Sequence, residues 1–506
     1  MKRHEQAIEK ATKSINQAKD KVSKNYWRLN YHVASPAYWI NDPNGFIFYK
    51  GEYHLFYQHH PFTSQWGPMH WGHVKSKDLT FWEHLPVALA PSEEYDKDGC
   101  FSGSAIEKDG KLYLMYTGHK WTGENHDTDL EQVQCLAVSE DGVSFKKIAS
   151  NPVIKGAPEG DIHPHHIRDP KVWKHGDYYY CVIGNKTKEE VGQVLLYRSE
   201  DLLEWEFLNI VAKGGGNFGF MWECPDLFHL DGHDILMMSP QGMVSEGHLY
   251  QNLHQSGYVL GKLDYESGKL DHGSFRLLDY GFDFYAPQST IDDQGRRVMV
   301  AWMAMWESEM PEQEFDWAGA MTLPRQLFIE DGQIISKPMP EVEKLRNNLT
   351  QFENVIFDGK RVFEGVSGYC LELDIVIDAK EATQFGLRLR VNDESKEETV
   401  LSYDCNESFL TLDRNKSGKG LKGIRKAPVE LKDNQLHLRV FLDKSSIEIF
   451  INGGEKVMTS RIYPSESSTG IEFFAKGPIS INSLKKWNLD KSVDVITKYS
   501  KSMAEN

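Results

Sequence analysis

The sequence of 506 residues is poor in cysteine and has no long hydrophobic run. Its six cysteines are scattered without a close pair, which suggests neither a zinc site nor a disulfide framework. The N-terminal segment lacks the apolar core of a signal peptide, and no stretch approaches the roughly 20 apolar residues of a membrane span. We therefore expect a cytoplasmic protein with reduced thiols and no membrane partner.

Positive charge is also scarce. The chain has 57 Lys and Arg residues against 74 Asp and Glu residues, and its formal net charge is −17. Binding to nucleic acid or to an anionic membrane requires clustered Lys and Arg, so this balance argues against both partners. A small neutral ligand is easier to reconcile with it. The sequence does not determine the oligomeric state.

A strand–turn–strand unit recurs five times, at intervals of about 60 residues. Each copy has a polar or acidic entry, an apolar strand, a turn containing glycine and a second apolar strand. The copies run from Asp42 to Gln58, Ser102 to Gly118, Arg168 to Gly184, Glu223 to Ser239 and Tyr285 to Trp302. Radial repetition of such units limits exposed strand edges. The pattern therefore predicts a five-bladed β-propeller over residues 26–336.

The two ends of the chain differ from this repeat. An amphipathic pattern in residues 1–25 predicts a helix, and we favour its packing against the body of the protein over a coiled coil with a partner. A proline-marked linker is expected at 337–352 and a β-sandwich at 353–490, because apolar alternation is clear there. Residues 491–506 would form a tail. The predicted fold class is all-β: a five-bladed propeller followed by a C-terminal β-sandwich, with a short N-terminal helix.

Three acidic residues stand at the entries of predicted blades, namely Asp42, Asp169 and Glu223. Each belongs to an acidic-Pro element: Asp42-Pro43, Asp169-Pro170 and Glu223-Cys224-Pro225. One such element would be an ordinary turn. Three at equivalent points of a rotational repeat would bring their carboxylates together in the central channel. Such a cluster shifts the pKa values of its members and is typical of a catalytic site.

These motifs resemble those of one known family. Trp39-Ile40-Asn41-Asp42-Pro43-Asn44-Gly45, Phe101-Ser102-Gly103-Ser104, Arg168-Asp169-Pro170 and Glu223-Cys224-Pro225-Asp226-Leu227 are similar to the ordered motifs of family 32 glycoside hydrolases, which include invertases and sucrose-6-phosphate hydrolases. The resemblance covers the chain from about Tyr26 to Leu489 and implies the same two-domain fold. Where the family usually has Met and Phe, this sequence has Ile40 and Ile167, which are apolar side chains of similar bulk.

The resemblance implies roles for ten residues. Asp42 would be the nucleophile, Glu223 the general acid/base and Asp169 the stabiliser of the transition state. The positions that would shape the sugar pocket are Asn41, Gln58, Trp66, Phe101, Ser102, Arg168 and Trp306. Retaining chemistry needs one ionised and one protonated carboxyl about 5–5.5 Å apart. We expect that short distance between Asp42 and Glu223, a raised pKa for Glu223, and an Arg168 that keeps Asp169 ionised.

The resemblance implies hydrolysis of β-fructofuranosyl bonds in sucrose and short fructooligosaccharides. Two alternatives stay open. The substrate could be sucrose 6-phosphate, or the propeller could bind sugar without cleaving it, because a fold does not set a function. Cys224 could also be read as a nucleophile, although packing beside Glu223 is the simpler interpretation.

Three histidines precede Arg168, at positions 163, 165 and 166. They lack the helical two-His face and the nearby thiolate pair of common zinc sites. A loop that lines the substrate entrance is the favoured interpretation. We expect neither a metal nor another cofactor.

Overall fold

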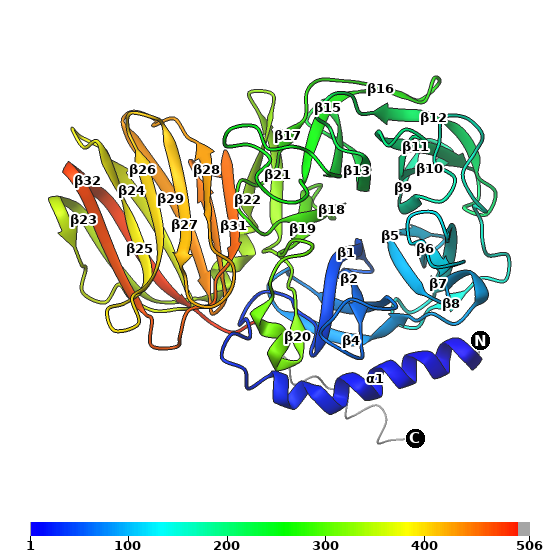
Figure 1. Ribbon diagram of the computed structural model, residues 1–506, viewed down its shortest axis with the longest axis horizontal. Helices are drawn as coiled ribbons and strands as arrows, with labels where there is room; N and C mark the ends of the chain where they lie inside the picture. Colours follow the sequence, from blue (N-terminus) through cyan, green and yellow to red (C-terminus); the bar gives the residue numbers. More distant parts are fainter. Residues whose placement is uncertain (1, 494–506) are drawn as a thin grey trace.

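The computed structural model describes residues 2–493 and contains a five-bladed β-propeller beside a β-sandwich (Figure 1). Blade I consists of β1 (Tyr38–Tyr49), β2 (Glu52–His60), β3 (His70–Ser76) and β4 (Trp82–Leu89). Blade II consists of β5 (Gly99–Lys108), β6 (Lys111–Trp121), β7 (Leu130–Ser139) and β8 (Lys146–Lys147). Blade III consists of β9 (Ile167–His175), β10 (Tyr178–Lys186), β11 (Gly192–Ser199) and β12 (Glu206–Lys213).

The other two blades follow in chain order. Blade IV consists of β13 (Met221–Leu230), β14 (His233–Gln241), β15 (Gly257–Asp264), β16 (Lys269–His272) and β17 (Arg276–Leu277). Blade V consists of β18 (Tyr285–Ile291), β19 (Arg297–Trp302), β21 (Arg325–Glu330) and β22 (Gln333–Pro338). The short helices η1 (Glu94–Asp96) and η2 (Pro311–Phe315) lie in loops between strands. The predicted five-bladed propeller is confirmed.

The first strand of each blade faces the centre of the ring. β1 contacts β5, β5 contacts β9, β9 contacts β13, β13 contacts β18, and β18 contacts β1 again. The ring is closed by β20 (Trp317–Ala318), which lies in the chain between the strands of blade V but pairs with β1 of blade I. The entries of all five repeats therefore surround one central channel.

The helix α1 (Lys2–Val22) lies along blade I and contacts β4 (Figure 1). Its buried face contains Ala11, Ala18 and Val22, which belong to the predicted apolar stripe. Near its start, Nε2 of the buried His4 accepts a hydrogen bond from the backbone N–H of Ala90, 3.1 Å away. The helix is therefore packed against its own chain, as we favoured.

The connection between the domains is shorter than the predicted linker 337–352. That segment contains the last residues of β22, the short helix η3 (Pro340–Leu345) and the start of β23 (Arg346–Arg361). Polar side chains weaken the alternation at the start of β23, and the strand is specified by its pairing with β32, more than 100 residues later. Local sequence carries little signal for such a pairing.

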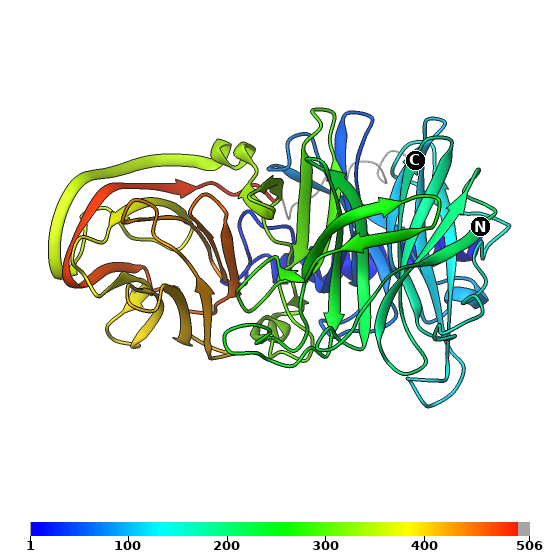
Figure 2. The same ribbon diagram turned by 90° about the horizontal axis from the view of Figure 1, so that it is seen from above.

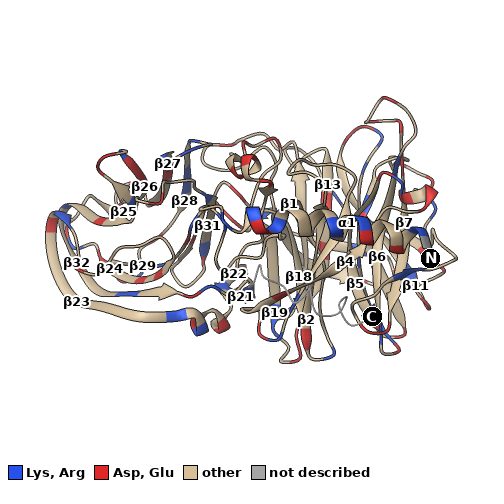
Figure 3. Cartoon of the chain, turned by 90° about the horizontal axis from the view of Figure 1, so that it is seen from below, with Lys and Arg blue, Asp and Glu red and all other residues tan. Residues whose placement is uncertain are grey.

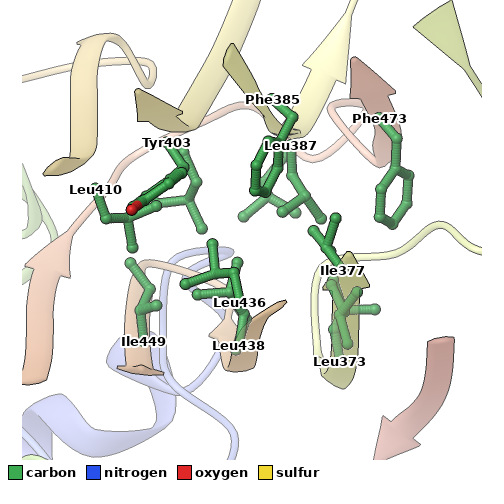
Figure 4. Close-up of a cluster of buried hydrophobic side chains, with 14 of the residues drawn as sticks. Leu373, Ile377, Phe385, Leu387, Tyr403, Leu410, Leu436, Leu438, Ile449 and Phe473 are labelled. Carbon is green, nitrogen blue, oxygen red and sulfur yellow. The ribbon is translucent and has the colours of Figure 1, made fainter. Parts of the chain in front are cut away.

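The C-terminal strands form two facing layers. Besides β23 they are β24 (Leu371–Asp378), β25 (Gln384–Asn392), β26 (Glu397–Asp404), β27 (Phe409–Lys416), β28 (Ile424–Pro428), β29 (Gln435–Asp443), β30 (Ser446–Ile451), β31 (Lys456–Arg461) and β32 (Gly470–Leu489). The first part of β32 pairs with β25 and its second part with β24, so this strand and β23 bend from one layer to the other (Figure 2). Figure 4 shows side chains of β25–β27 packed against those of β24, β29 and β30. The predicted sandwich is confirmed.

A buried polar network joins the two domains. His32, before blade I, donates from its two ring nitrogens to Asp443 Oδ2 and Glu448 Oε1 of the sandwich, both at 2.9 Å. Arg325 of blade V pairs with the same Glu448 and with Asp279. All five side chains are at most 1% exposed. Because buried charges are costly unless paired, this network holds the domains in one relative position.

After β32 the chain returns to the propeller. The backbone N–H of Trp82 donates to the carbonyl of Ser492, and Val493 packs in the core of blade I. The tail predicted from residue 491 therefore begins as an ordered contact, while 494–506 lie outside the described residues.

Basic and acidic residues are interspersed over both domains (Figure 3). None of the described helices has the length and apolar character to cross a membrane.

Candidate active site

The backbone distorts where the acidic residues enter the channel. The pairing of β1 with β2 shifts register between Ile40 and Pro43, and that of β13 with β14 shifts between Glu223 and Asp226. Asp169 and Cys224 adopt positive φ values of 67° and 47°. Bulges re-aim side chains, and strained residues of this kind concentrate at functional sites. The acidic-Pro elements thus turn their carboxylates out of the sheets and into the channel.

A pocket of about 270 Å³ opens at this end of the channel. All ten residues singled out from the sequence line it. They are Asn41, Asp42, Gln58, Trp66, Phe101, Ser102, Arg168, Asp169, Glu223 and Trp306. They come from blades I to IV and from the loop after β19. Residues up to 265 positions apart in the chain therefore form one cavity.

Asp42 is held by three donors. Ser102 Oγ donates to its Oδ2 at 2.6 Å, and the Asn41 side-chain amide donates to its Oδ1 at 3.1 Å. Trp39 Nε1 in turn donates to the Asn41 carbonyl oxygen at 2.8 Å and orients that amide. The Cys224 thiol lies 3.5 Å from Oδ2. These donors fix the carboxylate in one orientation, with only 8% of the residue exposed.

Glu223 is bound on both carboxylate oxygens. Arg168 donates from Nε and Nη2 to Oε1, each at 2.9 Å. Tyr285 OH donates to Oε2 at 2.6 Å, and Gln241 Nε2 donates to the same oxygen at 2.9 Å. Arg168 also contacts His166 Nδ1 at 3.1 Å. Charge-assisted bonds of this kind are strong and stabilise the ionised carboxylate.

Asp169 receives weaker support. The backbone N–H of Cys224 donates to its Oδ2 at 3.0 Å, and the Cys224 thiol lies 3.6 Å from that atom. Its own N–H donates to Thr117 Oγ1. No Arg or Lys forms an ion pair with Asp169 anywhere in residues 2–493. Arg168 is therefore the ion-pair partner of Glu223. Its charge still lowers the pKa of Asp169, as we expected, but burial and the charge of Glu223 outweigh that effect.

The three carboxyls titrate differently. Burial and the charge of Glu223 raise the pKa of Asp169 to about 7, although Arg168 opposes the shift. Burial and Glu223 also raise the pKa of Asp42. Burial disfavours the ionised form of Glu223, but the charge of Arg168 and the bonds from Tyr285 and Arg168 outweigh it, so its pKa is lowered. Our prediction of a raised pKa for Glu223 is wrong, because the Arg168 guanidinium donates two hydrogen bonds to its carboxylate.

The environment of the Cys224 thiol disfavours a role as nucleophile. Burial, followed by the negative charges of Asp169 and Asp42, raises its pKa well above the ordinary value. A thiol that stays protonated is a poor nucleophile and a weak hydrogen-bond donor. Cys224 instead contacts both Asp42 and Asp169 as a neutral group.

Aromatic rings form the walls of the pocket. The rings of Phe101 and His119 are stacked, with centroids 4.1 Å apart. Trp66 stands at the rim, 42% exposed, with its ring 6.2 Å from that of Phe101. Trp306 stacks on Trp39, and its buried Nε1 has no hydrogen-bond partner within residues 2–493. Flat apolar faces beside free polar donors suit a hydroxylated ring.

Several pocket residues escaped the sequence reasoning. They are Met69, His119, Trp121, His126, Leu130, Gln132 and Gln241. Tyr285, which bonds Glu223, did carry a signal, since it opens the fifth repeat. Gln241 carried none, because it ends an ordinary strand and reaches Glu223 only across the β13–β14 pair.

The histidine run contributes to the pocket through His166, which lines it. Burial and Arg168 lower the pKa of His166 to about 3, so its ring is neutral. His165 contacts the carbonyl of Leu130 at 3.0 Å. Over residues 2–493, no group of three or more His, Cys, Asp or Glu side chains could hold a metal ion.

Two buried carboxyls, Asp42 and Asp169, and the partly buried Glu223 meet in a pocket walled by aromatic rings, and this is the arrangement of a glycosidase. Glycoside hydrolysis uses a pair of carboxyl groups, one charged and one protonated. The comparison with known proteins specifies the family. The model of the glycosyl hydrolases family 32 N-terminal domain matches residues 32–338, and that of the family 32 C-terminal domain matches residues 341–488. The chain belongs to glycoside hydrolase family 32.

Named relatives agree with this assignment. The chain is 41% identical over 498 residues to a sucrose-6-phosphate hydrolase of Zymomonas mobilis, covering 95% of this chain and 96% of that protein. It is 42% identical over 455 residues to a raffinose invertase of Escherichia coli, covering 89% and 92%. The solved structure of a Bombyx mori GH32 beta-fructofuranosidase is 36% identical, with a TM-score of 0.85 and coverage of 97% and 99%.

Proposed function

We propose that this glycosidase hydrolyses terminal β-D-fructofuranosyl bonds in sucrose and short fructooligosaccharides, with retention of configuration. The observation that carries the proposal is the convergence of Asp42, Asp169 and Glu223, from three different blades, on one pocket. The names of the relatives, which include an invertase and a beta-fructofuranosidase, support the same substrate class.

The proposed reaction has two displacements. Asp42 attacks the anomeric carbon of the fructosyl unit and forms a covalent ester, while Glu223 gives a proton to the departing glycosidic oxygen. Glu223 then takes a proton from water, whose oxygen attacks the same carbon and releases Asp42. The bonds from Ser102 and Asn41 keep Asp42 oriented for the attack. No further reactant is needed.

In the proposed mechanism, substrate binding moves a proton from Asp169 to Glu223. With a pKa of about 7, Asp169 is the carboxyl that retains a proton near neutral pH. Sugar hydroxyls that donate to Asp169 would favour its ionised form. Its negative charge then raises the pKa of the neighbouring Glu223, and the proton of the cluster passes to Glu223, where the leaving group needs it. Binding of the correct sugar would thus prepare the general acid.

The rest of the pocket suits a neutral sugar. Trp66 and Phe101 offer rings for stacking, and the free Nε1 of Trp306 can donate to a hydroxyl oxygen. Gln58, which also lines the pocket, is fixed by its bond to the carbonyl of Cys100 at 2.9 Å. Among the lining residues, the one Lys or Arg is Arg168, which is engaged by Glu223. This favours sucrose over an anionic sugar.

Sucrose 6-phosphate is the second candidate, because the Zymomonas mobilis relative is named for that substrate. Its phosphate would have to reach cations beyond the lining, since Arg168 is occupied. A small carbohydrate is the proposed partner in either case.

We also propose a cytoplasmic location. All six cysteines are free thiols, and a reducing compartment such as the cytoplasm keeps thiols in that state.

Two measurements test the proposal. Proton NMR at early times should show β-fructose as the first product, and initial release of α-fructose would exclude double displacement. Initial rates on sucrose, sucrose 6-phosphate and a fructose trimer should rank sucrose and the trimer above the phosphorylated sugar. The reverse ranking would favour the second candidate, and tight binding of all three without release of fructose would leave only a sugar-binding role.

A further inference from the structure

A second cavity, of about 180 Å³, lies between the propeller and the sandwich. Its propeller side comes from the loop after β14, from β15, from the region of β17 and from β22, and its sandwich side comes from the turn before β31 and from β31 itself. Figure 1 shows β22 and β31 side by side at this boundary. It shares no lining residue with the acidic pocket.

The cavity is cationic in an acidic protein. Arg276 and Lys456 both line it, and neither forms an ion pair with a carboxylate within residues 2–493. Arg276 donates to the carbonyl of Gly332, and the nearest acceptor for Lys456 Nζ is Gln333 Oε1 at 3.4 Å. Glu455 also lines the cavity but is paired with Lys432 at 2.7 Å. Burial lowers the pKa of Lys456 although the charge of Glu455 opposes the shift, and Arg276 and Lys432 add to the lowering. A bound anion would favour the charged form of Lys456.

The remaining walls offer rings and hydroxyls. Tyr250, Tyr258 and Tyr280 line the cavity, and the backbone N–H of Ile334 donates to the Tyr258 oxygen at 2.9 Å, which leaves that hydroxyl proton for an acceptor. The buried hydroxyl of Ser336 has no hydrogen-bond partner within residues 2–493. Tyr250 has a φ of 56°. For a bulky residue this is a genuine outlier, and such strain concentrates at active sites and ligand clamps.

We propose that this cavity binds a monosaccharide-sized phosphate. Paired Arg and Lys donors with hydroxyl groups suit a phosphate, and tyrosine faces suit a sugar ring. The volume is below the about 300–1,000 Å³ of pockets for drug-sized ligands, so it fits one sugar ring and excludes an oligosaccharide. The site is distinct from the proposed hydrolytic pocket.

The segment 241–255 links the two cavities. At one end Gln241 Nε2 donates to Glu223, while Leu249 and Tyr250 line the second cavity. His254 pairs with Gln241 in an isolated β-bridge. An occupant that contacts Tyr250 would hold this segment and thereby the Gln241 donor. The second part of the proposal, which rests on the proposed function, is that occupancy changes kcat/KM for sucrose.

Calorimetric titration of the full-length protein tests the first part without any need for hydrolysis. Glucose 6-phosphate is the probe, with glucose and inorganic phosphate as comparisons. We expect the probe to bind at least tenfold more tightly than either comparison. Lys456→Met should weaken it at least tenfold, and Arg276→Gln, at an exposed residue, serves if the first variant folds poorly. Lys111→Met is the matched control, since Lys111 is an exposed lysine of blade II that does not line the cavity, and it should change affinity less than twofold.

Lys456→Met and Arg276→Gln should each hydrolyse sucrose at the rate of the unmodified protein when glucose 6-phosphate is absent. Binding that is unchanged by Lys456→Met and Arg276→Gln, or that is displaced by fructose, would place the probe elsewhere and overturn the site. Absence of binding would do the same. Saturation with the probe should shift kcat/KM for sucrose at least twofold in the unmodified protein and not in Lys456→Met. Binding with no such shift would overturn the link between the cavities and leave the hydrolytic function untouched.

Discussion

The buried His32 predicts how stability depends on pH. Burial opposes its protonation, but the hydrogen bonds to Asp443 and Glu448 and their charges outweigh burial and raise its pKa from 6.5 to about 9. A group whose pKa is higher in the folded state stabilises the fold fully below its unfolded pKa. That contribution is lost as the pH rises through the folded value. The fold should therefore lose stability between about pH 6.5 and pH 9.

The size of the effect follows from the shift. A change from 6.5 to about 9 corresponds to roughly 3 kcal/mol, at about 1.4 kcal/mol per unit. For two domains that unfold together, the entropy of unfolding scales with chain length, so this amounts to a melting temperature change of roughly 3 °C. His32→Gln removes the titrating ring but keeps a polar side chain between the two carboxylates.

Differential scanning calorimetry at pH 6 and pH 9.5 checks this. The difference in melting temperature between the unmodified protein and His32→Gln should be largest at pH 6 and shrink by roughly 3 °C at pH 9.5. His437→Gln is the matched control, because the His437–Asp374 pair is 39% and 32% exposed and such pairs contribute about 0–1 kcal/mol. A difference for His32→Gln that does not change with pH would refute the reasoning.

Three further predictions concern the acidic pocket. Asp42→Asn should lower kcat at least about 10⁴-fold with an unchanged circular dichroism spectrum, and substantial turnover would exclude Asp42 as nucleophile. Glu223→Gln should slow fructosides with poor leaving groups most, as measured by kcat/KM across a leaving-group series, and a uniform loss would contradict its role as general acid. Tyr285→Phe removes a donor that lowers the pKa of Glu223, so the alkaline limb of the kcat/KM profile should move to higher pH. Tyr197→Phe, at a buried tyrosine whose hydroxyl has no partner within residues 2–493, is the control and should leave that limb in place.

The sequence by itself determined the architecture and the convergence of the three acidic residues on one channel. The five repeats place Asp42, Asp169 and Glu223 at equivalent entries, and rotational repetition then brings equivalent entries to one channel. Apolar alternation likewise predicted the sandwich, because the side chains of a strand have a period of two. Repeats and apolar alternation can be recognised in the sequence itself, without knowledge of tertiary contacts.

Only the tertiary structure decided which charges meet. Arg168 is adjacent in sequence to Asp169, yet it bonds Glu223 from the next blade, and this reverses the expected order of pKa values. Three other features could not be predicted for the same reason. They are the start of β23 within the expected linker, the network around His32 and the cavity between the domains. Each depends on groups far apart in the chain, whose distance and exposure exist only after the ring closes and the sandwich docks.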